Sequence, residues 1–237
     1  MAKERCLEWV EYTKINAEVT GSRERVVREI GLSIYVNKTH FATVMMTPLM
    51  EEEFVVGHLF GQGIIEGASD IESIAIEDNA AQVTLRQVAA RRKNYSRIHS
   101  DLNIHMKDVI DGVNAILKSK IFAETEAVHS AGLFKSGIES ICIAEDIGRH
   151  NALDKVIGYG LLNEIDFSNT FAASTGRQPS EMILRCCRAN IPIIATKGVS
   201  TSLAIDIAEE AGLTIIGLVR RTGITIYSNP ARIRCME

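Results

Sequence analysis

The 237-residue sequence lacks an excess of basic residues, a long apolar run and a regular cysteine pattern. Its formal net charge is −4, so it offers no electrostatic footprint for nucleic acid. No apolar run is long enough to span a bilayer, and the N-terminus lacks the apolar core of a signal peptide. We therefore expect a soluble, cytoplasmic protein. The 46% hydrophobic and 24% charged residues are typical of a folded globular chain.

The five cysteines are too irregularly spaced for a secreted disulfide framework, and none forms a Cys-x-x-Cys pair. Cys142, in an apolar strand, is predicted to be a small buried residue. Cys186 and Cys187 are neighbours on a predicted helix, so they point about 100° apart and cannot face one substrate together. Cys6 and Cys235 lie near the chain ends, which we expect to be flexible and where a functional thiol is the alternative.

Several enzyme signatures are missing as well. The zinc-deaminase pattern requires His-x-Glu or Cys-x-Glu and a later Pro-Cys-x-x-Cys, and neither occurs. There is no Walker loop, no Gly-x-Ser-x-Gly elbow and no close pair of histidines on one helical face. The residues alone therefore predict no metal ligand set and no catalytic residue.

The first 105 residues are predicted to form a β-rich domain with one helix. The region 50–65 has apolar residues at helical spacing and three glutamates in its first turn, which suit the positive end of a helix. From residue 89 to about 105 the pattern breaks down, which predicts a linker. Two hairpins are predicted, with strands at 26–36, 39–47, 71–76 and 82–88.

From residue 106 the pattern changes to alternating helices and strands. Helices are predicted at 106–118, 151–164, 180–189 and 201–211, and strands at 127–134, 138–144, 170–174, 191–196, 213–219 and 224–227. The nearly continuous apolar strands indicate a sheet covered by helices. We therefore predict an α/β chain, α+β overall, with an α/β domain at 106–237 following the β-rich domain at 1–105.

The most informative segment is 145–155, which reads Glu-Asp-Ile-Gly-Arg-His-Asn-Ala-Leu-Asp-Lys, follows a predicted strand and opens a helix. Ligands in open α/β sheets bind at the carboxyl ends of strands. The free N–H groups of the helix start and the guanidinium of Arg149 favour an anion, and Gly148 permits close approach. The alternative to a ligand site is a structural role: any one of these residues could belong to a helix cap or a surface ion pair. In that case His150 only fills the polar edge of the helix. The combination favours a site that contains Arg149 and His150.

Three other junctions repeat this arrangement. The loop with Arg177 leads from a strand to a helix, as does the loop ending at Thr201, a candidate N-cap. The turn from Arg220 to Gly223 joins the last two strands. If the strands run parallel, these loops gather at one sheet edge and suit a phosphorylated or nucleotide ligand; ordinary polar loops are the alternative. His129 begins a strand near the same edge and is a candidate contact.

These residues resemble the formate dehydrogenase accessory sulfurtransferase family, FdhD. The resemblance runs from about residue 29 to 233, with a poor stretch at about 89–127. Its segments are 44–48, 63–66, 129–134, 145–158, 180–182, 200–204, 208–210 and 214–217. The resemblance implies a homodimer and a three-layer C-terminal domain like the cytidine deaminase fold without its zinc.

The resemblance also implies a function. Family members carry sulfur from a cysteine desulfurase to a molybdenum or tungsten bis-guanine-dinucleotide pterin cofactor, which is then inserted into formate dehydrogenase. The segment corresponding to the family's cofactor-binding residues is Leu218, Val219, Arg220, Arg221, Thr222 and Gly223. Members commonly end this segment in Arg, so we expect one phosphate or base contact to be missing at Gly223.

The chain departs from the family in the poor stretch. Members carry Cys-Gly-x-Cys-Gly there, with the persulfide on the first cysteine, whereas residues 97–103 read Arg-Ile-His-Ser-Asp-Leu-Asn and no cysteine stands between Leu7 and Ile141. Sulfur transfer requires a thiolate. We therefore expect an accessory protein that binds the cofactor without the carrier step. The alternatives are a sulfurtransferase with a relocated cysteine, a metal-free enzyme on a small nucleotide, and a guanine-nucleotide-binding regulator.

Overall fold

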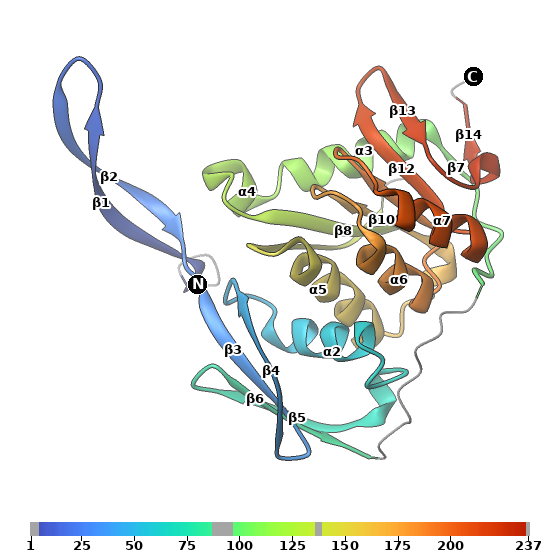
Figure 1. Cartoon of the computed structure of the whole chain (residues 1–237), viewed down its shortest axis with the longest axis horizontal. Coiled ribbons are helices and arrows are strands. Elements are labelled where there is room, and N and C mark those ends of the chain that lie inside the picture. The colour runs from blue at the N-terminus through green and yellow to red at the C-terminus, as the bar shows by residue number, and fades with distance from the viewer. Residues whose placement is uncertain (1–4, 87–96, 136–138, 236–237) are drawn as a thin grey trace.

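The computed structural model describes residues 5–86, 97–135 and 139–235 (Figure 1). It begins with a hairpin of two antiparallel strands, β1 (Leu7–Ile15) and β2 (Val19–Val27), which projects from the rest of the molecule. The sequence analysis predicts no strand before residue 26 and one unbroken strand over 26–36, and both predictions are wrong. The strand is interrupted at Arg28, whose N–H donates to the Cys6 carbonyl at 2.7 Å.

A four-stranded sheet follows, in the order β4-β3-β6-β5. Its two predicted hairpins are confirmed. Both turns, Asn37–Lys38 and Asp78–Asn79, have positive φ at their two central residues, as two-residue hairpin turns require. The elements are β3 (Ile30–Val36), β4 (Thr39–Met46), α2 (Glu51–Gly61), β5 (Ile71–Glu77) and β6 (Ala80–Leu85).

The larger sheet has six strands in the order β13-β12-β11-β10-β8-β9. The three strands β10, β11 and β12 are parallel, and the other pairings are antiparallel. The strands are β8 (His129–Lys135), β9 (Ser140–Asp146), β10 (Thr170–Ser174), β11 (Ile193–Thr196), β12 (Thr214–Arg220) and β13 (Gly223–Ile226). A short parallel pair, β7 (Ile104–His105) and β14 (Ile233–Arg234), lies outside this sheet.

Helices cover both faces of the larger sheet and make three layers. Phe134 and Phe171, whose rings stack with centroids 5.2 Å apart, pack with α3 (Met106–Leu117) on one face. The next residues along these strands, Leu133 and Ala172, belong to the cluster on the opposite face. The helices there are α5 (Arg149–Leu162), α6 (Ser180–Arg188) and α7 (Ser202–Ala211). The predicted α/β class is confirmed.

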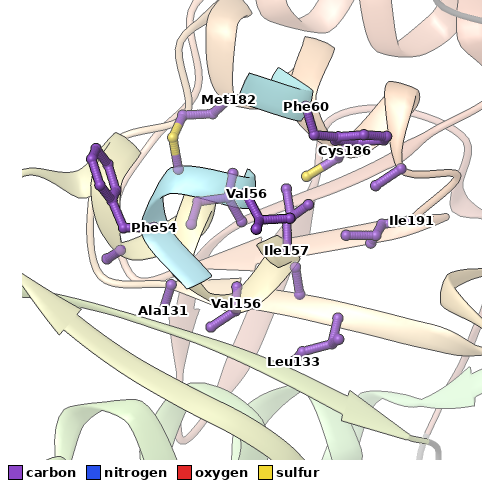
Figure 2. Packing of buried hydrophobic residues seen from close by; sticks show 14 of the residues in the cluster. Phe54, Val56, Phe60, Ala131, Leu133, Val156, Ile157, Met182, Cys186 and Ile191 are labelled. Carbon is purple, nitrogen blue, oxygen red and sulfur yellow. The ribbon is translucent and has the colours of Figure 1, made fainter. Parts of the chain in front are cut away.

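The small sheet joins the large one through a close crossing of α2 and α5. A Cβ added to Gly57 would lie 1.8 Å from the Asp154 carbonyl oxygen, and one added to Gly158 would lie 1.8 Å from that of Glu53. Figure 2 shows Val56 of α2 beside Ile157 of α5 within the same apolar cluster. Both halves therefore share one core, and the predicted boundary at residues 105 and 106 stays a prediction.

Two other expectations concern the middle of the chain. Residues 87–96, which include much of the predicted linker, lie outside the described residues. The following segment is tied to the large domain, because the Ile98 N–H donates to the Ala211 carbonyl at 2.7 Å. The sequence analysis misses the six-residue helix α4 (Lys120–Thr125). Among the described residues, no helix has the length and apolar character needed to cross a membrane.

Candidate functional site

The strand pairing brings four chain segments to one edge of the large sheet. His129 at the start of β8 is paired with Asp146 at the end of β9. In the same way, Ala131 is paired with Ser174 at the end of β10, which lies beside Thr196 at the end of β11. The helices α5, α6 and α7 all begin at this edge. Their free N–H groups and positive dipole ends favour an anion there.

Contacts join the loops of this edge into a continuous row. Gly176 lies against the side chain of Arg149, because an added Cβ would come within 2.9 Å of the Arg149 Cβ. The Gly176 carbonyl accepts from Thr196 Oγ1 at 2.6 Å. Farther along, the Gln178 carbonyl accepts from the Thr201 N–H at 3.3 Å. Thus the loops that follow β9, β10 and β11 touch one another.

The end of β12 completes the row. The Leu218 N–H donates to the Gly198 carbonyl at 2.8 Å, and Arg220 Nη1 donates to the Lys197 carbonyl at 2.9 Å. Leu218 has a φ of 49°, the left-handed region that non-glycine residues avoid, at an irregularity in the β12–β13 pairing. Val219 is buried in the core beside α3, so only its backbone is available at the edge.

The edge is strongly basic. The side chains of Arg177, Lys197, Arg220 and Arg221 are exposed, and Arg149 is half-buried. Thr201 and Thr222 add exposed hydroxyl groups, and Gly223 begins β13. The structure therefore brings the predicted residues to one edge, as the strand-end argument requires. Their role in binding a ligand stays a prediction.

Four buried polar atoms at this edge lack hydrogen-bond partners within the part of the chain that is described: Ser130 Oγ, Arg149 Nε, His150 Nε2 and Gln178 Oε1. They surround one loop, since the Ser130 N–H donates to Thr175 Oγ1 and Gln178 Nε2 donates to the Gly176 carbonyl. Buried polar atoms nearly always have a partner, so these atoms point to a ligand or ordered water. The sequence did not single out Ser130 or Gln178, because burial without a partner leaves no sequence pattern.

The two histidines differ in their surroundings. His129 Nδ1 lies 3.3 Å from Thr175 Oγ1, and burial together with the charge of Arg149 lowers its pKa. His150 Nε2 lies 3.5 Å from a carboxylate oxygen of Glu181, and burial together with the Arg185 and Arg149 charges lowers its pKa. His129 also borders a pocket of about 240 Å³ that reaches Lys197. His150 Nε2 makes no hydrogen bond within the described residues, so both readings of His150, ligand contact and polar edge, stay predictions.

The carboxylate of Asp146 has a structural role. It accepts from the backbone N–H groups of Thr47 at 3.1 Å and Gly148 at 2.8 Å, and from Asn151 Nδ2 at 2.8 Å. Lys155 Nζ forms an ion pair with it at 2.7 Å and also donates to the Thr47 carbonyl. Asp146 and Lys155 are fully buried. This half of the 145–155 motif ties the end of β9 to the end of β4.

A second buried ion pair lies at the crossing of α2, α5 and α6. Arg185 Nε donates to Asp154 Oδ1 at 2.7 Å, and His58 Nδ1 lies 3.2 Å from Asp154 Oδ2. Burial raises the pKa of Asp154, but Arg185 and His58 outweigh it and bring the pKa below its ordinary value. Asp154 is therefore a structural anion. Within the motif, only Arg149 and His150 remain as candidates for the exposed edge.

Comparison with known proteins identifies the family. The model of the FdhD/NarQ family matches residues 27–107 and 89–234, which together cover most of the chain. The chain belongs to the FdhD/NarQ family. The sulfur carrier protein FdhD of Methanothermobacter thermautotrophicus is 32% identical over 229 residues, covering 89% of this chain and 92% of that protein. That of Sulfurisphaera tokodaii is 36% identical over 214 residues, covering 81% and 84%.

A solved structure agrees with this fold. The crystal structure of a putative formate dehydrogenase accessory protein from Desulfotalea psychrophila superposes with a TM-score of 0.88 and 29% sequence identity. The match covers 97% of this chain and all of the other. The resemblance to FdhD drawn from the motifs is confirmed.

Four of the five cysteines of this FdhD/NarQ protein are buried and poorly placed for sulfur chemistry, and the fifth, Cys235, is exposed. Burial raises the pKa of Cys142 and of Cys187 to about 12, and it also raises that of Cys186. Cys6 is fully buried in a small apolar cluster and burial raises its pKa, so it is no better placed as a functional thiol. Thiols of this kind stay protonated and are weak nucleophiles at neutral pH.

Proposed function

We propose that this FdhD/NarQ protein binds the bis-guanine-dinucleotide molybdenum cofactor, as substrate, during formate dehydrogenase maturation, and that it lacks the sulfur-carrying step. The row of basic side chains above buried, unpartnered polar atoms carries this proposal. A guanine dinucleotide presents a pyrophosphate, which suits arginine forks and helix N-termini. It also presents a purine edge, which suits a buried acceptor such as Gln178 Oε1 and a donor such as Arg149 Nε.

The partners follow from the same proposal. Formate dehydrogenase receives the loaded cofactor, and a homodimer would offer two equal sites to a substrate with two guanosine ends. We also propose the cytoplasmic location and the likeness of the C-terminal domain to the cytidine deaminase fold, both of which rest on the family resemblance. A cysteine desulfurase belongs to the alternative in which a relocated cysteine carries sulfur.

Nucleotide binding is tested by isothermal titration of the full-length protein with GDP. We expect Arg149→Ala and Arg220→Ala each to weaken binding about tenfold to a hundredfold, since a hydrogen bond to a charged group contributes ~1.5–3 kcal/mol. The matched control is Arg86→Ala, an exposed arginine that directly follows β6 of the small sheet, which should bind GDP like the wild type. Absence of GDP binding by the wild type, or equal binding by all four proteins, would refute the site.

The sulfur step has a separate test. The protein is incubated with a cysteine desulfurase and cysteine, and its intact mass is measured. We expect no stable gain of one sulfur atom, because the described cysteines other than Cys235 are buried. A persulfide mapped to a single cysteine would show that a relocated thiol carries sulfur, and the accessory role without sulfur transfer would fall.

A further inference from the structure

The pocket of about 240 Å³ that His129 borders, hereafter the α4 pocket, continues the basic edge toward α4. Its lining includes Phe122 and Glu126 of α4, His129 of β8, and Ile147, Thr175 and Lys197, which directly follow β9, β10 and β11. Figure 1 shows α3 and α4 on one side of these strands and α5 and α6 on the other. The α4 pocket therefore lies across the sheet edge from the helix N-termini that favour an anion.

The walls of the α4 pocket are apolar and include an aromatic ring. Leu117, Phe122 and Ile147 line it and are half-buried, so part of each side chain faces the open space. The backbone that carries Phe122 is fixed, because a carboxylate oxygen of Glu145 accepts from the Ile121 N–H at 2.8 Å and from the Phe122 N–H at 2.7 Å. Apolar and aromatic walls suit the flat face of a ligand ring.

Polar groups of both signs also line the α4 pocket. The side chains of Glu126 and Lys197 are exposed, and neither has a hydrogen-bond or ion-pair partner within residues 5–86, 97–135 and 139–235. Glu126 has a φ of 52°, a left-handed conformation that is costly for a non-glycine residue. Thr175, which also lines the pocket, accepts from the backbone N–H of Ser130, whose buried Oγ lacks a partner.

The size of the α4 pocket limits its ligand. Pockets that enclose a whole drug-sized molecule measure about 300–1,000 Å³. At about 240 Å³ the α4 pocket takes one fused ring system, and not a complete nucleotide. The ring should have apolar faces, donors for the Glu126 carboxylate and a negative group for Lys197.

We propose that the α4 pocket binds the pterin ring of the cofactor, an assignment that rests on the proposed function. The 2-amino group and the neighbouring ring N–H of a pterin form two parallel donors, which a carboxylate accepts as it accepts the fork of an arginine. Glu126 would bind this edge, and Phe122 would contact the face of the ring.

Lys197 connects the α4 pocket with the nucleotide part of the proposed site. Its side chain lines the pocket, and its carbonyl accepts from Arg220 Nη1 at 2.9 Å. A cofactor with its pterin in the α4 pocket and its pyrophosphate at the basic edge would pass beside this lysine. Guanine has the same pair of donors as a pterin, so the experiment has to separate the two rings.

The test titrates full-length protein into 6-carboxypterin, a fluorescent pterin with one carboxylate, and follows the fluorescence anisotropy. We expect a dissociation constant on the order of 0.1–1 mM, since a single ring system has few atoms with which to bind. Saturating GDP should leave this constant unchanged, because the nucleotide occupies the other side of the sheet edge.

Glu126→Gln removes the carboxylate and keeps the size of the side chain. We expect it to weaken pterin binding about tenfold and to bind GDP like the wild type. The matched control is Glu164→Gln, an exposed glutamate with a φ of 53° that follows α5 at the far end of that helix. This control should bind the pterin like the wild type.

Three results would overturn the proposal. One is a constant anisotropy up to about 1 mM protein. Another is equal pterin binding by Glu126→Gln and the wild type. The third is displacement of the pterin by GDP, which would place the ring in the guanine site. Loss of pterin binding with intact GDP binding would refute the α4 pocket and leave the proposed function standing, whereas failure of both ligands would refute both.

Discussion

Two polar groups of the molecule arise from the same eleven-residue motif and differ in how their atoms are satisfied. In the buried group, Asp146 and Lys155 are fully buried, and each has several protein partners. At the sheet edge, Arg149 Nε, together with the neighbouring Ser130 and Gln178, is buried and lacks a partner within the described residues. The first group holds the fold together, and the second is the group to which the proposed function assigns a ligand.

This difference separates structure from function more clearly than residue type does. Asp, Asn and Lys are common in active sites, yet here they join β9 and α5 to the small sheet. A buried ion pair that loses one member leaves an uncompensated charge, which is strongly destabilising. A buried atom that already lacks a partner contributes no hydrogen bond to the folded state. Its removal should therefore leave the free energy of unfolding unchanged or raise it.

The largest expected effect follows from removing Lys155. Lys155→Met leaves Asp146 buried without its cation, and we expect a loss of about 3–5 kcal/mol in the free energy of unfolding. Urea denaturation followed by circular dichroism measures the loss. Lys107→Met, on the exposed pair with Asp111, should change stability by less than about 0.5 kcal/mol. Equal losses in the two variants would mean that the buried ion pair contributes no more to stability than the exposed one.

The close helix crossing gives the next effect. Gly158→Ala would force α2 and α5 apart, since its Cβ would overlap the Glu53 carbonyl oxygen. We expect a loss of about 3 kcal/mol, the upper end for overpacking, in the same denaturation experiment. Gly223→Ala is the matched control, because an added Cβ there meets nothing within 4 Å. A Gly158→Ala protein as stable as the control would contradict the proximity of the two helices.

Two buried serines, one with hydrogen-bond partners and one without, give the next prediction. Ser228 Oγ donates to the Leu213 carbonyl and accepts from the Ile215 N–H, so Ser228→Ala should cost about 1 kcal/mol. Ser130 Oγ lacks a partner within the described chain, so Ser130→Ala should leave stability unchanged or raise it by up to ~1 kcal/mol. Stability measurements on both variants decide the sign. A clear loss in Ser130→Ala would show that its hydroxyl is satisfied in the free protein.

The smallest effect is a dependence on pH. Burial and nearby arginines lower the pKa of His129 and of His150 from 6.5 in the folded protein. Below pH 6.5 the two histidines therefore bind protons more readily in the unfolded chain than in the folded one. The free energy of unfolding falls as the pH decreases. His150→Gln should reduce this slope in denaturation curves recorded from pH 7.5 to 5.5. An unchanged slope would remove His150 from the explanation.

Much of the fold follows from local chemistry. Asn37, Asp78 and Asn79 adopt positive φ more readily than most residues, so the sequence indicates both turns. The apolar strands of the large sheet are buried on both faces, which leaves a continuous apolar pattern in the sequence. The hairpin β1–β2 escapes prediction because both of its faces are exposed, so the sequence shows no alternation of buried and exposed residues. Helix α4 escapes because six residues are too short for a helical period.

The candidate site divides in the same way. Strand-end loops rich in Arg, Gly and Thr indicate an anion site, and parallel strands bring such loops to one edge. The neighbouring sequence does not predict which residues of the 145–155 motif are structural and which lie at the exposed edge. Lys155 meets the Thr47 carbonyl 108 positions away, and Asp154 meets His58 96 positions away. No local pattern reports contacts of that separation.

Residue type, spacing and strand ends were enough to predict the family, the α/β class and the group of loops that carry positive charge. The folded chain was needed to show which polar residues have hydrogen-bond partners, which cysteines are buried, and that one hairpin projects from the body. Whether an atom is buried and has a hydrogen-bond partner depends on which distant segments of the chain pack around it. That surrounding exists only once the chain has packed.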